Sequence, residues 1–459
     1  MDETTLARLT RERTGRPRPP VAVAHLGLGS FFRAHQASYT DRAPDADAWG
    51  VAAFSGRSAD LARRLTEQDG LYSLLVQGPD GATASVVSSL AAAHPGGAVR
   101  TWLDVLAEPA TALVTITVTE AAYLRKDDGS LDLTEAGGDV AALRRGDLDQ
   151  VTTVPGRLAA GLVARWRAES GPIAVVPCDN LLRNGASVRR VVLDLADEVD
   201  AGLADWIRSS VSFVDSEVDR ITPRTTADDI TTAASLLGLR DECLVVTEPF
   251  SEWVIAGEFP AGRPGWEHAG ATFVDEVTPY EERKLWLLNG AHSLLAYAAG
   301  TRSHRTVSEA MADDTCAGWV EAWWDEAVPH LDLPADTLAS YRADLLVRFG
   351  NPGIQHLLEQ IAADGSQKLP VRVLPVLRAE RSAGRVPHAA ARTLGAWIAH
   401  LRGSGAAVND PLADVLTDRA AGALPDAVRR VLEVLDAELP ADRAVVDAVV
   451  AQAEELERR

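Results

Sequence analysis

The sequence predicts an α/β protein in which a Rossmann-like doubly wound sheet is followed by a mainly α-helical carboxyl-terminal domain. Short apolar runs alternate with helical patterns from Val21 to about Phe273, and this alternation is typical of a sheet covered by helices on both faces. After Pro279 the pattern is almost wholly helical, with breaks at glycine and proline residues. We therefore expect one domain over residues 1–277 and a second over residues 278–459.

Apolar runs mark the strands of the predicted sheet. The first begins at Val21, and the others cover residues 49–54, 112–119, 173–176, 210–214 and 243–247. Helical patterns separate them along the chain, which favours parallel pairing.

The first strand leads into a turn that contains Gly27 and Gly29, and then into a helix. A dinucleotide-binding βα unit requires this context, because Gly27 allows a tight turn and Gly29 lets a pyrophosphate approach the helix amino terminus. Phe32 replaces the third glycine of the usual fingerprint, so the motif is incomplete. Arg33, one turn into the helix, either adds positive charge to the phosphate site or lies on the solvated surface.

The clearest helix start lies at Thr278, where Pro279 and Glu281 complete a capping box with proline at the first helical position. We expect one α-helix from there to about Gly300. A polar trio interrupts its apolar sequence, namely Lys284, Asn289 and His292.

At 100° per residue, Lys284, Asn289 and His292 fall within an arc of roughly 140°, so they can line one site. A partly desolvated amine can exchange a proton with a hydroxyl and act as a general base. The amide can donate to a carbonyl or alkoxide oxygen, and the imidazole can fix a second hydroxyl. The trio thus suits the reversible oxidation of a secondary alcohol. The alternative is that Lys284 snorkels to solvent and that the other two satisfy backbone groups.

Composition restricts the class of protein. The 459 residues are 46% apolar and carry a formal net charge of −21, which disfavours nucleic acid and anionic membranes as partners. The acidic start of the chain and the shortness of its apolar runs predict neither a signal peptide nor a membrane span. Three scattered cysteines suit a reducing cytoplasm. We expect a cytoplasmic enzyme, as a monomer or a weak homo-oligomer.

Several segments together resemble the long-chain mannitol dehydrogenase and fructuronate reductase family. The likeness covers about residues 20–400, and its motifs are residues 27–36, Thr119-Glu120, residues 177–180, residues 218–223, Lys284-x4-Asn289-x2-His292 and residues 364–370. The lysine motif, combined with Asp179-Asn180 and with Val218-Asp219-Arg220-Ile221, is specific to that family.

The resemblance implies a role for each matching residue. Lys284 is the expected general acid/base, Asn180 and Asn289 are the expected donors to the reacting oxygen, and Asp219 and His292 are expected to orient the substrate and Lys284. Asn180 and Asp219 each follow a strand-like run, so both are expected at carboxyl ends of strands, where open α/β sheets bind ligands. Alternatively, Asn180 caps a helix and Asp219 pairs with an arginine. The residues expected to bind the cofactor are Gly27, Gly29, Phe31, Arg33, Arg57, Thr119 and Glu120.

No metal is implied. Cys178, Cys243 and Cys316 lie far apart without a Cys-x-x-Cys motif, and no pair of histidines has zinc-ligand spacing on a helix. This counts against a zinc alcohol dehydrogenase.

The cofactor is expected to be NAD, which the family favours. An NAD enzyme usually has an acidic residue at the end of the second strand, yet Ser55-Gly56-Arg57 stands there, with Asp60 beyond it. Arg57 leaves NADP open, as a ligand of a 2′-phosphate, or else faces water at a helix start.

The stretch from Asp364 to Arg372 is closer to the fructuronate and tagaturonate reductase branch than to the mannitol branch, and Lys368 or Arg372 could meet a uronate carboxylate. Both could equally be surface charges. We expect a hexuronate or aldonate oxidoreductase, with a mannitol or other polyol dehydrogenase as the alternative. A β-hydroxyacid dehydrogenase lacks these motifs, and a dinucleotide-binding sensor without turnover would not need Lys284, Asn180 and Asn289.

Overall fold

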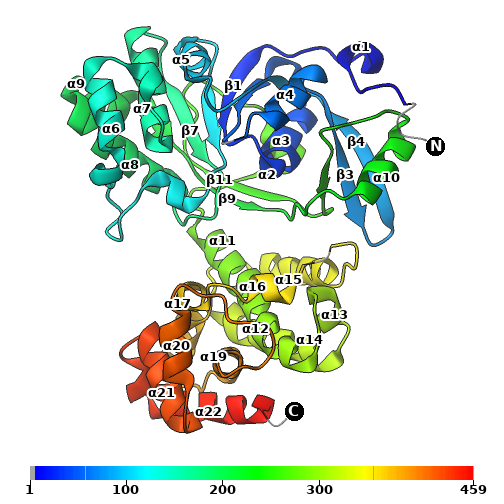
Figure 1. Cartoon of the computed structure of the whole chain (residues 1–459), viewed down its shortest axis with the longest axis vertical. Helices are drawn as coiled ribbons and strands as arrows, with labels where there is room; N and C mark the ends of the chain where they lie inside the picture. Colours follow the sequence, from blue (N-terminus) through cyan, green and yellow to red (C-terminus); the bar gives the residue numbers. More distant parts are fainter. Residues whose placement is uncertain (1–5, 57, 355, 458–459) are drawn as a thin grey trace. The chain divides into compact units, whose positions relative to one another are not determined.

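The computed structural model describes residues 6–56, 58–354 and 356–457, and Figure 1 traces the chain. The chain divides into two compact units, Met1–Thr278 and Pro279–Arg459. Arg57, for which a 2′-phosphate contact and a solvated position were both left open, lies outside the described residues.

A six-stranded sheet organises the amino-terminal unit, in the order β5 (Leu90–His94), β2 (Gly50–Phe54), β1 (Val21–Leu26), β6 (Leu113–Ile116), β7 (Ile173–Pro177) and β8 (Val211–Phe213). Every neighbouring pair is parallel. The strand order changes direction between β1 and β6, and ligands of such sheets bind at the carboxyl ends of the strands around this point. The predicted doubly wound fold is confirmed.

Helices cover the sheet on both faces (Figure 1). Ala24 and Leu26 of β1 belong to a core shared with α5 to α9, whereas Val23 belongs to a core shared with α2, α3 and α4. Successive strand residues point to opposite faces, which explains this division. The helices of these two cores are α2 (Ser30–Ala34), α3 (Gln36–Arg42), α4 (Asp60–Glu67), α5 (Val99–Ala107), α6 (Leu133–Arg145), α7 (Val154–Arg167), α8 (Asn184–Val199) and α9 (Ala201–Ser210). The short helix α1 (Arg11–Thr14) precedes them in the chain, and α10 (Ala227–Leu237) follows them.

Two smaller sheets differ from the prediction. The run at 243–247 forms β10 (Val245–Thr247), which pairs with β3 (Tyr72–Gly78) beside β4 (Gly81–Val87) and not with the main sheet. The third sheet consists of β12 (Thr272–Phe273), β11 (Glu252–Ala256) and β9 (Asp215–Asp219). The edge strand β5 and the β3–β4 hairpin were missed, although Asp80-Gly81 is a hairpin turn signal.

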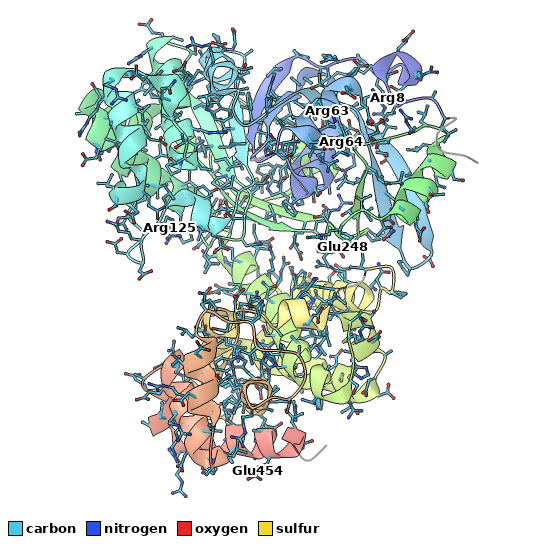
Figure 2. All side chains as sticks on the ribbon, in the orientation of Figure 1. Arg8, Arg63, Arg64, Arg125, Glu248 and Glu454 are labelled. Atoms are coloured by element: carbon cyan, nitrogen blue, oxygen red, sulfur yellow. The ribbon has the colours of Figure 1, made fainter. Side chains whose placement is uncertain are left out.

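Charged side chains fix the segment that precedes β10. Arg8 pairs with the carboxylate of Glu242 at 3.2 Å, and Arg64 of α4 donates to the carbonyl oxygen of Glu242 at 3.0 Å. Figure 2 labels the two arginines. The buried Asp241 accepts a hydrogen bond from the amide of Gln68 at 2.7 Å. These long-range contacts hold the second sheet beside α4.

The carboxyl-terminal unit is helical, as predicted (Figure 1). The buried helix α12 (Ala291–Ala298) packs against α14 (Asp314–Ala327), α16 (Leu358–Ile361), α17 (Gly365–Arg372) and α19 (His388–Leu401), and α19 packs against α22 (Arg443–Glu457). The remaining helices are α13 (Val307–Met311), α15 (Ala335–Phe349), α18 (Leu374–Ser382), α20 (Ala413–Ala420) and α21 (Leu424–Leu435). None of the described helices combines the length and apolar character needed to span a bilayer.

The expected single α-helix after Thr278 is wrong in its geometry. The segment consists of α11 (Thr278–Arg283), a π-helix over Lys284–Gly290, and α12. A 3₁₀ turn over Ala299–Arg302 follows α12. A π-helix has i→i+5 hydrogen bonds, so each residue advances by roughly 80° instead of 100°. This changes which side chains share a face.

Candidate active site

The turn after β1 needs glycine at position 27. Gly27 has φ +112°, and a Cβ there would lie 2.0 Å from the carbonyl oxygen of Thr117, which follows β6. Gly29 has an extended backbone and immediately precedes the short helix α2, and at His35 the chain leaves α-helical geometry before α3. The backbone of β1 therefore lies directly against β6 at the point where the strand order changes direction.

His25, which the sequence motifs did not indicate, supports this turn through buried side-chain contacts. Its ring is fully buried and stacks on Phe32, with ring centroids 3.5 Å apart. Its nitrogens contact the hydroxyl oxygens of Thr115 at 2.8 Å and Thr117 at 3.2 Å. Burial lowers the pKa of His25 to about 3, so the ring is neutral and serves as a hydrogen-bonding tie between β1 and β6.

Arg33 and Phe31 follow the turn. The Arg33 guanidinium is buried, donates to the carbonyl oxygens of Gly29 (3.1 Å) and Cys243, and lies 5.4 Å from the ring of Tyr72. Because the guanidinium is already bonded within the amino-terminal unit, we propose no phosphate contact for Arg33. Phe31 is half-buried and stacks on His35 at 5.0 Å.

The Thr119-Glu120 and Asp179-Asn180 motifs follow the neighbouring strands β6 and β7, so they lie at the same edge of the sheet as Gly27 and Gly29. Thr119, Glu120 and Asn180 are exposed there. Asp179 accepts a hydrogen bond from the hydroxyl of Tyr123 at 2.5 Å. Burial, with a smaller contribution from the charge of Glu120, raises the pKa of Asp179 to about 6.

Asp219 is not at the end of a strand of the main sheet, which corrects the expected position. It is the last residue of β9 and is buried. In the antiparallel register of β9 and β11, it stands opposite Glu252. Asn184, the first residue of α8, ties β9 to the start of that helix, because its side chain accepts from the Ser216 N–H at 2.9 Å and donates to the Ser216 carbonyl at 2.8 Å. Asn184 was missed because its partner is 32 residues away.

Lys284 and Asn289 stand on the π-helical turn, and both are half-buried. In ideal π-helical geometry, at roughly 80° per residue, five residues amount to about 400°, which leaves about 40° between the two positions. An ideal α-helix would leave about 140° between them. The π-helix therefore brings the amine and the amide onto one face of the turn.

His292 lies in α12, just beyond the π-helical turn, and is buried. Its ring is 4.8 Å from the ring of Phe349 and 4.8 Å from that of His356. Burial, together with the charges near it, holds the pKa of His292 well below its usual value. The ring is thus neutral near pH 7. It can donate a hydrogen bond from one nitrogen and accept one at the other without taking up a proton.

The two predicted carboxylate ligands lie on α17, which packs against the π-helical turn. Lys368 donates to the carbonyl oxygens of Ile361 (3.3 Å) and Ala363 (2.6 Å). Arg372 donates to the Ser293 hydroxyl at 3.2 Å, beside His292, and burial lowers the pKa of Arg372 to about 10. Its recorded side-chain partner among the described residues is thus a neutral hydroxyl.

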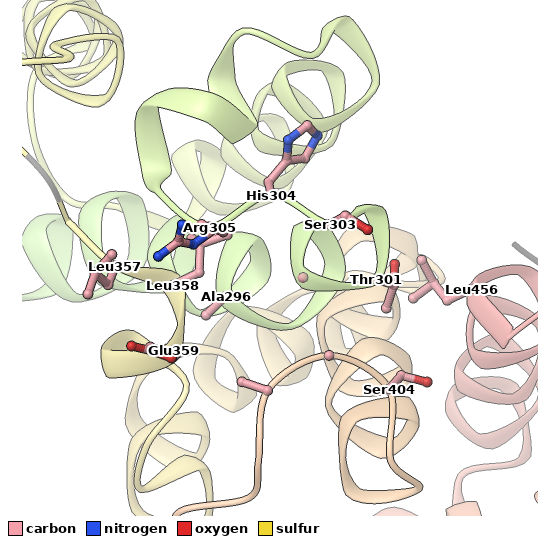
Figure 3. A pocket seen from close by; sticks show the side chains of 13 residues that line it. Ala296, Thr301, Ser303, His304, Arg305, Leu357, Leu358, Glu359, Ser404 and Leu456 are labelled. Carbon is pink, nitrogen blue, oxygen red and sulfur yellow. The ribbon is translucent and has the colours of Figure 1, made fainter.

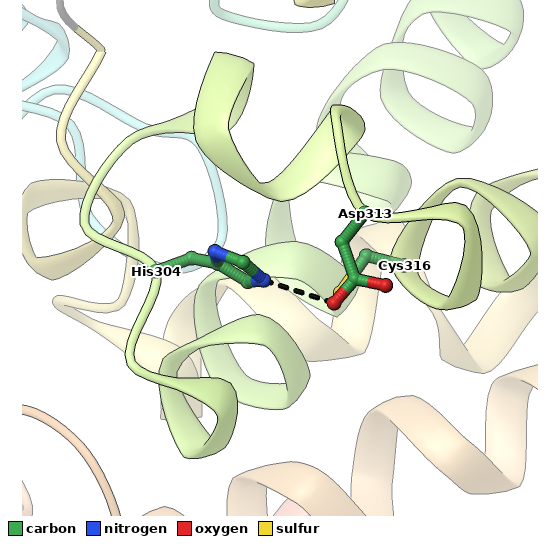
Figure 4. Close-up of side chains that lie close together, drawn as sticks. All are labelled: His304, Asp313 and Cys316. Atoms are coloured by element: carbon green, nitrogen blue, oxygen red, sulfur yellow. Dashed lines mark hydrogen bonds and ion pairs between the residues drawn. The ribbon is translucent and has the colours of Figure 1, made fainter.

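A cluster of potential metal ligands lies elsewhere in the helical unit and comprises His304, Asp313 and Cys316 (Figure 4). Asp313 caps α14 by accepting from the Thr315 N–H at 2.8 Å, and its other oxygen accepts from Arg302 at 2.7 Å and contacts His304 at 3.0 Å. The cation of Arg302 thus already compensates the carboxylate, and the cluster is explained as a helix cap.

An open cavity of about 550 Å³ lies next to His304 (Figure 3). Thr301, Ser303, Arg305 and Glu359 contribute to its walls, and none of the predicted site residues does. This cavity is therefore separate from the polar groups described above.

Comparison with known proteins assigns both units to one family. Residues 21–268 match the mannitol dehydrogenase Rossmann domain, and residues 276–457 match the mannitol dehydrogenase C-terminal domain. The chain belongs to the mannitol dehydrogenase family. The predicted resemblance is thereby confirmed, and the protein is an NAD(P)-dependent oxidoreductase that acts on CH–OH groups.

Relatives that are named for different substrates have about the same sequence identity to this chain. The D-mannonate oxidoreductase of Escherichia coli is 36% identical over 83% of this chain and 80% of its own length. The D-arabinitol 4-dehydrogenase of Ralstonia nicotianae is 37% identical over 85% of each chain. The structure of Pseudomonas fluorescens mannitol 2-dehydrogenase with NAD and D-mannitol is 31% identical over 98% of this chain and 97% of its own, with a TM-score of 0.81.

Proposed function

We propose that the protein interconverts a secondary alcohol and a ketone on a hexuronate or aldonate, in the manner of a fructuronate or tagaturonate reductase, with Lys284 as general acid/base. The observation that carries the substrate class is Arg372. This half-buried guanidinium donates to the neutral Ser293 hydroxyl, and within the described part of the chain no ion pair joins it to a carboxylate. Partial loss of hydration makes a cation without a neighbouring anion costly, and a substrate carboxylate would compensate it.

In the proposed reaction the neutral amine of Lys284 takes the proton of the substrate hydroxyl, and the ammonium returns it in the reverse direction. The nicotinamide cofactor, when bound, accepts or gives the hydride. Asn289, on the same face of the π-helical turn, and Asn180 donate to the reacting oxygen. Neutral His292 bonds a neighbouring hydroxyl, and Asp219 orients the substrate.

The amino-terminal unit supplies the proposed cofactor site. The glycine turn leaves no room for a side chain at Gly27, and Gly29, Thr119 and Glu120 lie at the same edge of the sheet. We propose NAD as the cofactor, supported by the NAD-bound relative. Arg57→Ala should then weaken neither NADH nor NADPH selectively; a selective loss of NADPH by about 1–3 kcal/mol would instead assign Arg57 to a 2′-phosphate.

The substrate class is tested by comparing fructuronate, tagaturonate and fructose as oxidants of NADH. We expect a higher kcat/KM for the two keto-uronates, and we expect Arg372→Met to narrow that ratio at least tenfold, since a charge-assisted contact contributes about 1.5–3 kcal/mol. Lys368→Met is tested alone and with Arg372→Met, and Arg378→Met, which removes the surface ion pair with Asp436, is the matched control. A wild type that prefers fructose would place the protein with the polyol dehydrogenases.

A further inference from the structure

The π-helical turn under Lys284 needs a source of stability. A π-helix is rare and short because its hydrogen-bond geometry is unfavourable, and it occurs often at functional sites. Here α-helices continue on both sides of Lys284–Gly290, so local sequence preference alone would favour one continuous α-helix. Contacts from outside the segment must therefore favour the π form.

Two adjacent tryptophans of α14 supply such contacts. The indole N–H of Trp323 donates to the carbonyl oxygen of Trp286 at 2.7 Å, and that of Trp324 donates to the carbonyl oxygen of Leu287 at 2.9 Å. Both indoles are fully buried. The two acceptors are consecutive residues in the middle of the π-helical turn. Where the regular hydrogen bonds of a helix are disturbed, its buried carbonyl groups need other donors. The two indole N–H groups supply them here.

The fit around Trp323 is close. A Cβ at Gly290, the last residue of the π-helical turn, would lie 2.6 Å from Cζ2 of Trp323. The indole therefore lies directly against the backbone of the turn, and only glycine leaves room for it. Trp324 is linked to His292 through Phe349. The ring centroids of Trp324 and Phe349 are 6.2 Å apart, and those of Phe349 and His292 are 4.8 Å apart.

We propose that Trp323 and Trp324 are positioning residues for catalysis: their indole N–H groups hold the π-helical turn and thereby set where the Lys284 amine and the Asn289 amide stand. This inference rests on the acid/base role proposed for Lys284. In a continuous α-helix the two side chains would diverge by about 140°, whereas the π-helix keeps them within about 40°. The tryptophans thus act on the reaction through the backbone, without contacting the substrate.

The test compares Trp323→Phe and Trp324→Phe with Trp319→Phe. Trp319 lies on the same helix and is also largely buried, but its recorded contacts are with the side chains of Arg302 and Arg392. All three variants lose a similar volume, so the control measures the general cost of a smaller ring. Incorporation of 3-benzothienylalanine at position 323 or 324 removes the N–H donor and keeps the shape of the ring.

Hydrogen exchange measures the turn without reference to catalysis. Amide exchange of a peptide that covers Lys284–Gly290 should be about tenfold faster or more in the variants at 323 and 324 than in wild type and the Trp319 control. Unchanged exchange in this peptide would overturn the inference.

Kinetics measure the positioning. We expect kcat to fall about 10- to 100-fold in the two variants, with KM and the Kd of NADH within about threefold of wild type. The pH at which kcat/KM is half-maximal should shift by about half a unit or more, a change that a purely structural role would not produce. Faster exchange with wild-type kcat and pH profile would also overturn the inference.

Gly290→Ala gives an independent perturbation, since its methyl group would displace Trp323. Its control is Gly318→Ala on α14, where the added Cβ meets nothing within 4 Å. Gly290→Ala should reproduce the exchange and kinetic changes; wild-type behaviour would count against the inference. Full activity of Lys284→Ala would refute the proposed function itself, and this separate variant distinguishes that failure from a failure of the tryptophans.

Discussion

Gly27→Ala tests how closely β1 and β6 must approach at the cofactor turn. The φ of +112° costs an L residue about 1–3 kcal/mol. The added Cβ would lie 2.0 Å from the Thr117 carbonyl oxygen, so that contact must lengthen by about 1 Å to reach the 3.0 Å that real Cβ contacts require. Thr117 would then lose its bonds to the carbonyl oxygens of Leu26 (2.9 Å) and Gly27 (2.9 Å), at about 1 kcal/mol each. The expected total loss is about 3–5 kcal/mol.

Gly81→Ala is the matched control, because Gly81 has φ +123° in the same unit but open space around its Cβ position. It should lose only the backbone contribution of about 1–3 kcal/mol. Urea unfolding followed by circular dichroism measures both losses, and fluorescence titration measures NADH binding. Gly27→Ala should bind NADH at least about tenfold more weakly, because its turn is displaced, whereas Gly81→Ala should bind normally. Equal stability losses and equal NADH affinities in the two variants would refute the reasoning.

Three further predictions concern the amine, the metal ligands and the buried imidazole. Lys284→Ala should lower kcat by about 10² to 10⁴ in steady-state assays and leave the Kd of NADH nearly unchanged, since only proton transfer is removed. Exhaustive chelation should leave activity intact, because Arg302 already occupies the carboxylate of the His304, Asp313 and Cys316 cluster; stoichiometric zinc in the active protein would contradict this. Since burial lowers the pKa of His25 from 6.5 to about 3, only the unfolded chain takes up this proton below pH 6.5. The unfolding free energy of wild type should therefore fall as the pH decreases from 6.5 towards 3, by up to about 1.4 kcal/mol per pH unit more than that of His25→Gln. Parallel urea-midpoint curves for the two proteins between pH 7 and 5 would argue against it.

Much of the sheet could be predicted because its strands are continuous apolar runs. Five of the six predicted runs became β1, β2, β6, β7 and β8 of the main sheet. The sixth, at 243–247, is equally apolar but pairs with β3. Its pairing depends on contacts such as those of Glu242 with Arg8 and Arg64, from distant parts of the chain. An apolar run indicates that a strand is buried and does not indicate which sheet receives it.

The sequence by itself determined the chemistry available to this protein: a glycine turn after a strand, an amine, amides and an imidazole at fixed spacing, and the family that these motifs identify. Only the tertiary structure decided how the groups are held. It turned the segment from Lys284 to Gly290 into a π-helix, placed Asp219 in a separate sheet, and left Arg372 beside a neutral hydroxyl. The physical reason is that these outcomes depend on hydrogen bonds between residues far apart in the chain, such as those from Trp323 and Trp324 to a turn 37 residues away. Periodicity reports only local preference, and tertiary contacts override it here.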